Sequence, residues 1–192
     1  MIAIVKYNAG NIQSVKNAVE RLGFSCIVTD DENELKSAEK VIFPGVGEAS
    51  SAMNYLKERK LDFIIKNLKQ PVLGICLGQQ LMCNFSEEGH TECLGIFDVN
   101  VKKFKAKEKV PHMGWNNLSE IKSDLFNGIS PENDFYFVHS FYSEIGENTT
   151  SICDYINPFS ASMQKDNFYA TQFHPEKSSK IGEQLLMNFL QL

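Results

Sequence analysis

The residue of this chain best placed to act as a nucleophile is a cysteine at an expected sharp turn. Cys76 lies in the segment Gly-Ile-Cys-Leu-Gly at residues 74–78, between an expected strand and an expected helix. Glycines on both sides allow the chain to turn sharply and hold the thiol at the carboxyl edge of a sheet. The N–H groups and dipole at the start of the following helix favour the thiolate. The alternative is a buried cysteine that acts as a small hydrophobic residue.

A second segment supplies a base and a carboxylate. Residues 172–176 read Gln-Phe-His-Pro-Glu, and Pro175 keeps His174 in an extended conformation. Residues two apart in an extended chain face the same side, so His174 and Glu176 can act on one target. The imidazole would take the proton of Cys76 while the carboxylate fixes the tautomer of the ring. The alternative is a solvated histidine and a surface glutamate at the end of a strand.

A third segment, Pro-Gly-Val-Gly at residues 44–47, follows an expected strand. Its glycines allow backbone N–H groups to turn inward, as an oxyanion hole requires, although a simple strand-to-helix turn is the alternative. The segment is not a dinucleotide-binding motif, because Ser50 occupies the position of the third glycine.

A zinc site is the competing interpretation for the cysteines near residue 76. Cys83, His90 and Cys93 follow Cys76 closely along the chain. Cys83 would lie two helical turns from Cys76, roughly 10 Å along the helix axis, which is too far for one shared ion. The sequence therefore predicts no metal site at these residues.

Strand-like and helix-like segments alternate in the first two-thirds of the chain. Strands are expected at residues 2–6, 24–28, 41–43 and 71–75, and helices at 11–22, 49–56, 61–68 and 77–85. After Gly95 the expected strands are 96–104, 135–138, 151–156, 160–164 and 168–173, followed by a helix at 181–190. This order predicts an α/β fold of three layers, α/β/α. Its central sheet is mostly parallel, and antiparallel strands are added in the C-terminal half.

Length and composition argue against several classes of protein. The 192 residues carry a formal net charge of −5, which argues against nucleic-acid binding, and residues 1–192 are expected to form a single domain. No apolar run approaches the ~18 residues of a membrane helix, and no signal peptide is expected at the start. Five cysteines, an odd number, favour free thiols in a reducing cytoplasm.

Taken in order, the three segments resemble the triad class of glutamine amidotransferases. Within that class, Val-Pro-His-Met-Gly-Trp-Asn at 110–116 and Tyr-Phe-Val-His-Ser at 136–140 are similar to the glutaminase subunits of imidazole glycerol phosphate synthases, the HisH family. The segment Gln-Lys-Asp-Asn-Phe-Tyr at 164–169 supports the same assignment. The resemblance covers essentially the whole chain.

The resemblance implies a chemistry and a set of site residues. Cys76 would attack the side-chain amide of glutamine, His174 would shuttle the proton and Glu176 would orient His174, with no cofactor. The oxyanion and substrate-binding positions of the family fall on Gly45, Val46, Gly47, Leu77, Gln80, Glu88, Ser140 and Phe141. The carboxylate of Glu88 suits the ammonium group of glutamine.

The family also implies a partner. Its ammonia passes to a (β/α)₈-barrel cyclase subunit, HisF, which makes imidazole glycerol phosphate and an aminoimidazole carboxamide ribonucleotide in histidine biosynthesis. Positions at that interface and along the ammonia path fall on Asn11, Trp115, Asn116, Tyr136 and Lys177. Lys-Tyr-Asn-Ala at residues 6–9 departs from the usual start of the family, near the expected partner surface.

Other functions compete with this one. A paralogous subunit for the amidation of surface sugars would share the glutaminase chemistry, and a stand-alone cysteine hydrolase would act without a partner. A scaffold subunit without chemistry is disfavoured, because Cys76, His174 and Glu176 are all present.

Overall fold

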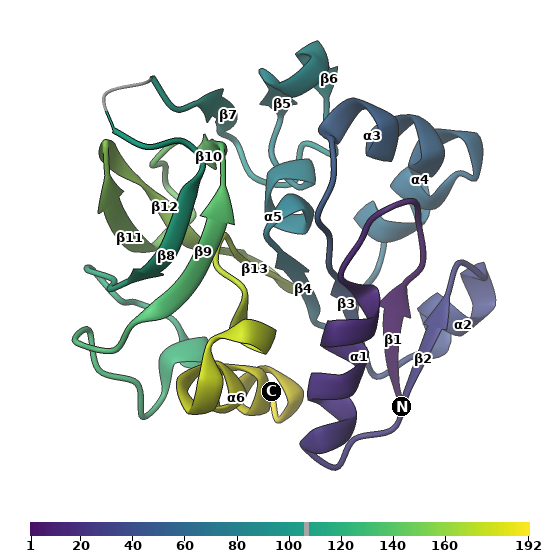
Figure 1. The fold of residues 1–192 in the computed structure, drawn as a ribbon. Coiled ribbons are helices and arrows are strands. Elements are labelled where there is room, and N and C mark those ends of the chain that lie inside the picture. Colours follow the sequence, from purple (N-terminus) through teal and green to yellow (C-terminus); the bar gives the residue numbers. More distant parts are fainter. Residues whose placement is uncertain (106–107) are drawn as a thin grey trace.

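A seven-stranded sheet forms the centre of the computed structural model, which describes residues 1–105 and 108–192 (Figure 1). Its strands, in spatial order, are β11 (Thr149–Tyr155), β12 (Asn157–Lys165), β13 (Phe168–Thr171), β4 (Val72–Ile75), β3 (Lys40–Phe43), β1 (Ile2–Val5) and β2 (Cys26–Thr29). The five strands from β13 to β2 run parallel, whereas β12 and β11 are added antiparallel. This topology confirms the mostly parallel sheet with antiparallel strands in the C-terminal half.

Helices cover both faces of this sheet. Because side chains alternate along a strand, Ala3 and Val5 belong to one apolar cluster and Ile2 and Ile4 to another. The first cluster includes residues of α2 (Glu32–Ser37), α3 (Ala49–Glu58), α4 (Leu61–Lys66) and α5 (Leu77–Leu81). The second includes residues of α1 (Ile12–Arg21) and α6 (Ser179–Leu190), so the fold has the three layers that the sequence predicts (Figure 1).

Shorter strands build a second region beside the main sheet. One small sheet has the order β10 (Phe141–Ser143), β7 (Asn100–Lys103), β5 (Phe85–Ser86) and β6 (Thr91–Glu92). A hairpin joins β8 (His112–Asn116) to β9 (Phe135–His139). Three short 3₁₀ turns complete the fold, namely η1 (Glu88–His90), η2 (Asp124–Phe126) and η3 (Pro175–Lys177). Across the two described ranges, no helix has both the length and the apolar character needed to cross a membrane.

Several element boundaries differ from the expectation. The helix expected at 77–85 ends at Leu81, because the returning chain donates to the carbonyl of Met82 from the N–H groups of Ile96 and Phe97, at 2.8 and 2.9 Å. The strand expected at 96–104 is the shorter β7. Helix α2 and strand β8 were not expected. The N-cap of α2, Asp31, accepts from the backbone N–H groups of residues 33 and 34 and could have indicated that helix.

Candidate active site

The backbone at Cys76 has the geometry of a nucleophile elbow. Cys76 follows β4 directly, and its φ of 54° and ψ of −105° lie in a region that L residues rarely adopt. Its N–H donates to the carbonyl of Thr171 at the end of β13, with a distance of 2.7 Å. The neighbouring strand therefore holds the strained turn and places the thiol between the end of β4 and the start of α5.

Two glycines make this turn sterically possible. A Cβ on Gly78 would lie only 1.9 Å from the carbonyl oxygen of Phe43 in β3. A Cβ on Gly74 would lie 2.9 Å from the sulfur of Met82 and 3.0 Å from the backbone of Gly78. The strand before the turn and the helix after it therefore pack at distances that only glycine permits at these positions.

We expect Gly78→Ala to lower the free energy of unfolding by about 1–3 kcal/mol, because the atom it meets is backbone and cannot rotate away. For a chain of this size that corresponds to a fall of roughly 2–12 °C in the thermal midpoint. Differential scanning fluorimetry measures it. Ser14→Ala on the exposed face of α1 is the matched control. Equal midpoints for the two variants would contradict the close packing.

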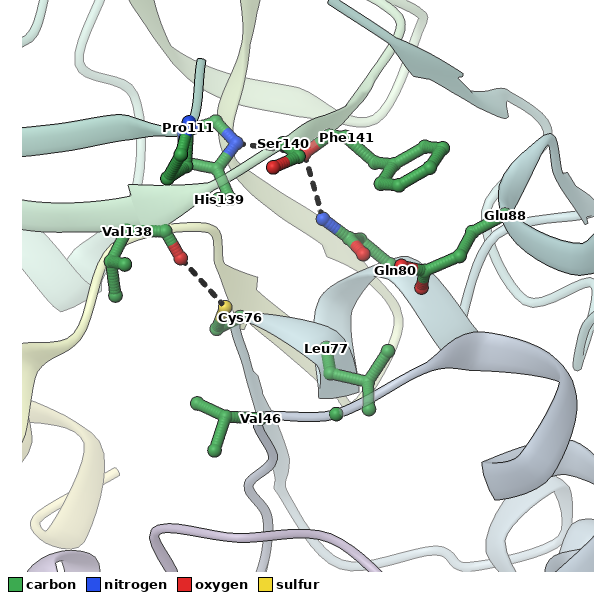
Figure 2. A pocket seen from close by; sticks show the side chains of 11 residues that line it. Val46, Cys76, Leu77, Gln80, Glu88, Pro111, Val138, His139, Ser140 and Phe141 are labelled. Carbon is green, nitrogen blue, oxygen red and sulfur yellow. Dashed lines mark hydrogen bonds between the residues drawn. The ribbon is translucent and has the colours of Figure 1, made fainter.

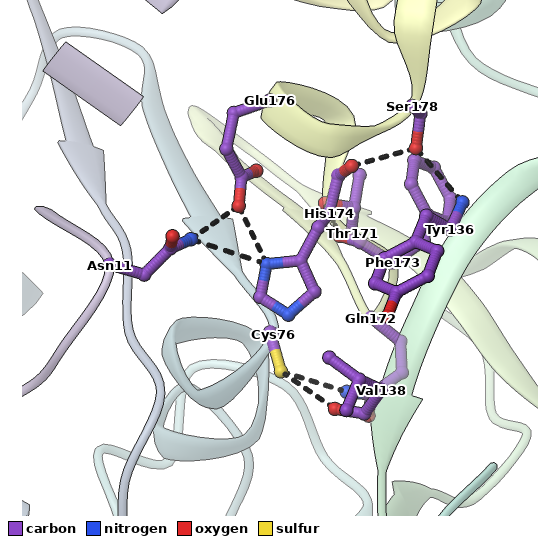
Figure 3. A network of polar contacts seen from close by, with 10 residues as sticks. All are labelled: Asn11, Cys76, Tyr136, Val138, Thr171, Gln172, Phe173, His174, Glu176 and Ser178. Carbon is purple, nitrogen blue, oxygen red and sulfur yellow. Dashed lines mark hydrogen bonds and ion pairs between the residues drawn. The ribbon is translucent and has the colours of Figure 1, made fainter. Parts of the chain in front are cut away.

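His174 and Glu176 lie side by side behind the thiol. Nδ1 of His174 is 2.7 Å from Oε1 of Glu176, and both side chains are completely buried. The N–H of His174 donates to the carbonyl of Tyr136 in β9 at 2.9 Å, which fixes the backbone from the hairpin side. Figure 3 shows Nε2 of the ring turned toward the sulfur of Cys76, and this nitrogen has no hydrogen-bond partner among the described residues. The structure thus brings together the three residues that the sequence singles out.

The charges in this cluster act on the protonation state of the imidazole. Burial alone would lower the pKa of His174, but the adjacent Cys76 thiolate and the Glu176 carboxylate outweigh it and raise the pKa to about 10. The protonated ring is therefore favoured opposite a thiolate and a carboxylate. A protonated imidazole beside the sulfur can later donate that proton to a leaving group.

Two further side chains contact this cluster. Nδ2 of Asn11 donates to Oε1 of Glu176 and lies 3.5 Å from Nδ1 of His174. Nε2 of Gln172 lies 3.7 Å from the sulfur of Cys76 (Figure 3). Asn11, which was expected at the partner interface, is partly exposed and also touches the carboxylate. Gln172 was not singled out, although it belongs to the same segment as His174.

Glu176→Gln tests the orienting carboxylate. We expect a large loss of the glutaminase activity that the resemblance implies, with roughly 10- to 100-fold more residual rate than Cys76→Ala leaves, as for orienting residues in such triads. Because the carboxylate helps to raise the pKa of His174, its loss lowers that pKa, and the alkaline limb of kcat/KM moves to lower pH. A pH–rate profile of both proteins measures this. An unshifted alkaline limb would contradict the role.

A cavity of about 250 Å³ opens over the thiol (Figure 2). Its walls come from the turn after β3, the start of α5, the turn η1 and the connection between β9 and β10. The lining residues are Val46, Gly47, Cys76, Leu77, Gln80, Glu88, Pro111, Val138, His139, Ser140 and Phe141. Of the predicted oxyanion and substrate-binding residues, Gly45 alone does not line it. Three lining residues, Pro111, Val138 and His139, were not singled out from the sequence.

Hydrogen-bond acceptors face this cavity. Oε2 of Glu88 accepts from the N–H of Ala49, the first residue of α3, at 2.9 Å. Burial raises the pKa of the Glu88 carboxyl, and the hydrogen bond from Ala49 opposes that rise. Nε2 of Gln80 donates to the carbonyl of Phe141 at 2.8 Å and to Oε1 of Gln172 at 3.0 Å, which leaves the Gln80 Oε1 for another donor. The cavity can therefore hold an ammonium group and a primary amide.

One predicted oxyanion donor is occupied in this structure. The N–H of Leu77, directly after Cys76, donates to the carbonyl of Gly45 at 3.2 Å. An oxyanion hole needs this N–H to point at the substrate oxygen. The carbonyl of Gly45 must therefore move before Leu77 can serve that purpose.

The segment at 44–47 is held on its other sides as well. The hydroxyl of Tyr7 donates to the carbonyl of Pro44 at 2.6 Å, and the N–H of Gly10 donates to the carbonyl of Val46 at 2.9 Å. Tyr7 is buried, with 5% of its surface exposed. Residues 6–9 differ from the usual start of the family, and among them Tyr7 packs on the expected oxyanion loop and does not lie at an open surface.

Apolar side chains are exposed on the β8–β9 hairpin. Met113 and Trp115 are 58% and 53% exposed, and the Trp115 ring lies 5.9 Å from that of Tyr136. Lys177 ends the turn η3 directly after Glu176 and is also exposed. All five predicted interface residues, Asn11 included, thus reach the surface at least in part.

The cysteines and histidine of the zinc alternative do not gather. The sulfur of Cys83 lies 3.4 Å from the hydroxyl of Ser143 and 3.5 Å from the carbonyl of Gln79, inside the core. Within residues 1–105 and 108–192, no three His, Cys, Asp or Glu side chains are placed to hold a metal ion.

Comparisons with known proteins agree with this geometry. The family model "Glutamine amidotransferase class-I" matches residues 3–192. "Imidazole glycerol phosphate synthase subunit HisH" of Bacteroides fragilis is 60% identical, over 100% of this chain and 99% of that protein. The protein of the same name from Colwellia psychrerythraea is 47% identical over 98% of this chain and 92% of its own. The chain belongs to the HisH family of class I glutamine amidotransferases. The resemblance seen in the motifs is thereby confirmed.

Solved structures support the fold of this class I glutamine amidotransferase. A protein described as a GMP synthase subunit, from Thermoplasma acidophilum, has a TM-score of 0.76 at 19% identity and covers 100% of this chain and 92% of its own. PurLQS from Thermotoga maritima has a TM-score of 0.74 at 19% identity and covers 99% of this chain and 97% of its own. At such identities the likeness concerns the fold alone.

Proposed function

We propose that this chain is the glutaminase subunit of an imidazole glycerol phosphate synthase. It hydrolyses glutamine to glutamate and ammonia with Cys76 as nucleophile, His174 as acid and base, and Glu176 as the group that orients His174. The observation that carries the proposal is the completely buried His174–Glu176 pair, whose free nitrogen faces a thiol at the floor of a cavity. The HisH name of relatives up to 60% identical supports the same role.

The first half of the reaction forms a thioester. The Cys76 thiolate adds to the amide carbon of glutamine, and the carbonyl oxygen becomes an oxyanion. When the C–N bond breaks, the proton on Nε2 of His174 goes to the departing nitrogen, and ammonia leaves. A ring held at Nδ1 by a carboxylate donates from Nε2, which is the nitrogen that faces the sulfur.

The second half regenerates the enzyme. His174 is now neutral at Nε2 and takes a proton from water, which adds to the thioester carbon. The C–S bond then breaks, Cys76 returns as the thiolate and glutamate leaves. Glu88 is placed to hold the ammonium end of glutamine during both halves, and the Gln80 Oε1 is placed to hold the amide until the C–N bond breaks.

The partner in this proposal is a HisF-type (β/α)₈-barrel cyclase subunit that takes up the ammonia. Support comes from the relatives' name, which describes one subunit of a synthase, and from the exposed Met113 and Trp115 on the hairpin. Large apolar side chains gathered on one face are typical of protein interfaces. The same hairpin contributes Val138 to the cavity, so the docking face and the active site share one element.

We further propose that residues 1–192 form a single amidotransferase domain that works in the cytoplasm. The family model spans nearly the whole chain. Cys26, Cys76, Cys83, Cys93 and Cys153 are all free thiols in the structure, as proteins of reducing compartments have.

A glutamate-release assay tests the proposal and its alternatives. It compares the isolated chain, the complex with the barrel subunit, and the complex with the nucleotide substrate of the barrel. Amide-¹⁵N glutamine with excess unlabelled ammonium shows whether the ammonia travels inside the complex. We expect fast glutamate release only in the loaded complex, with ¹⁵N retained in the product. A full rate from the isolated chain would favour the stand-alone hydrolase. Release stimulated only by a sugar-amidating partner would favour the paralogous subunit.

A further inference from the structure

Two buried histidines lie beside the cavity and take no part in the proposed triad. His139 ends β9 and lines the cavity, and His112 begins β8. Nδ1 of His112 is 3.0 Å from Nε2 of His139. The rings sit among aromatic side chains, and that of His112 stacks on Tyr155 with 4.0 Å between centroids and on Phe137 with 4.9 Å.

The backbone fixes where the protons of this pair lie. Nδ1 of His139 is 2.7 Å from the carbonyl oxygen of Phe141, which can only accept, so Nδ1 carries the hydrogen. Nε2 of a neutral His139 is then an acceptor, and the hydrogen between the rings belongs to Nδ1 of His112. Nδ2 of Asn116 lies 3.5 Å from the remaining nitrogen of His112 and can donate to it.

Both rings must be neutral for this arrangement, and their surroundings make them so. Burial lowers the pKa of His112 to about 4 and that of His139 to about 3. The hydrogen bond to Phe141 opposes this fall at His139, whereas the charges of His112 and His174 add to it.

The carbonyl of Phe141, which accepts from His139, also accepts from the side chain of Gln80, one of the predicted substrate-binding residues. Nε2 of Gln80 donates to the carbonyl of Phe141 at 2.8 Å (Figure 2). The same nitrogen donates to Oε1 of Gln172 at 3.0 Å. Gln172 in turn reaches the sulfur of Cys76 at 3.7 Å. A continuous chain of hydrogen bonds therefore runs from His139 along the cavity wall to the nucleophile.

We propose that His139, supported by His112, is a positioning residue for glutamine binding. By holding the Phe141 carbonyl, it keeps the Gln80 amide oriented with Oε1 toward the cavity. This inference rests on the proposed glutaminase reaction and concerns the same site. Neither histidine touches the reacting atoms, so both act through Phe141 and Gln80.

Core packing alone does not account for this pair. The ring of His139 lies 5.3 Å from that of Phe104 and 5.1 Å from that of Phe159, an environment that a phenylalanine would fill without polar atoms. Burying an imidazole is unfavourable unless its nitrogens are hydrogen-bonded. Both nitrogens of His139 are hydrogen-bonded, Nε2 to His112 and Nδ1 to the carbonyl of Phe141, a residue of the cavity wall.

Two substitutions of His139 separate positioning from packing. His139→Leu removes the donor, whereas the side-chain amide of His139→Asn offers N–H where Nδ1 was. We expect His139→Leu to raise the KM for glutamine about tenfold with a smaller change in kcat, and His139→Asn to stay within about threefold of the parent. The assay uses the loaded complex. His90→Asn, at an exposed histidine, is the matched control. Equal KM values for the Leu variant and the parent, or for the Leu and Asn variants, would overturn the proposal.

A spectroscopic measurement decides the matter even if the Leu variant does not fold. The ¹⁵N-labelled parent chain has four imidazole side chains, which are assigned with single substitutions. At pH 7 we expect His139 and His112 to be neutral Nδ1–H tautomers. An Nε2–H tautomer or a protonated ring at His139 would overturn the proposal. A parent complex that releases no glutamate would refute the glutaminase function instead, and the tautomer of His139 would still test the hydrogen bond to Phe141.

Discussion

Cys76→Ala is expected to abolish glutamine-dependent synthesis, by about 10⁴-fold or more, and to leave synthesis from ammonium salts unchanged. The thiolate forms the thioester, and no other described group lies where it could replace the sulfur beside Nε2 of His174. The chemistry of the barrel needs ammonia and not the nucleophile. Alanine also keeps the Cβ at the strained turn, so the elbow itself is retained.

Both activities are measured on the same preparation of the complex. Cys26→Ala, at a half-buried thiol on β2, is the matched control and should keep both the glutamine-dependent and the ammonium-dependent activity. If Cys76→Ala lost the ammonium-dependent activity as well, the residue would be needed for folding or docking. In that case the assignment as nucleophile would lose its main support.

The isolated chain is expected to release glutamate about a hundred- to a thousandfold more slowly than the loaded complex. The N–H of Leu77 is bound to the carbonyl of Gly45 at 3.2 Å, so one oxyanion donor is withheld. Each such donor contributes roughly 3–4 kcal/mol to the stability of the transition state. Docking of the partner would then act by moving the segment 44–47 away from Leu77.

Tyr7→Phe tests that explanation within the isolated chain. The Tyr7 hydroxyl holds the carbonyl of Pro44 at 2.6 Å, and its loss weakens the resting position of the segment by about 1 kcal/mol. We expect the basal rate of glutamate release to rise about 3- to 10-fold, while Tyr55→Phe on α3 leaves it unchanged. A basal rate that does not rise in a folded Tyr7→Phe variant would contradict the idea. A full rate in the parent chain would do the same.

Much of the site could be predicted because its chemistry is encoded in short segments. Glycines around Cys76 indicate an elbow, and the proline after His174 keeps that residue extended, so each local geometry follows from a few neighbouring residues. The alternation of strands and helices likewise predicts the layers and the parallel sheet. These features depend on contacts close in the sequence.

The features that could not be predicted depend on contacts between distant segments. Asn11 reaches Glu176 across most of the length of the chain, and nothing around either residue indicates that contact. The bond between Leu77 and Gly45 depends on how the segment 44–47 is rotated, which its composition leaves open. The pairing of His112 with His139 requires the β8–β9 register. In β8 the apolar Met113 and Trp115 are exposed and His112 is buried, which reverses the usual burial pattern of a strand.

Covalent trapping of the thiol tests whether Cys76 is the nucleophile. The loaded complex is treated with a diazoketone analogue of glutamine, which alkylates the nucleophile that attacks it, and the modified residue is located by mass spectrometry. We expect a single adduct on Cys76 that excess glutamine prevents and that Cys76→Ala lacks. An adduct on another of the five cysteines, or no adduct on protein that still releases glutamate, would contradict it.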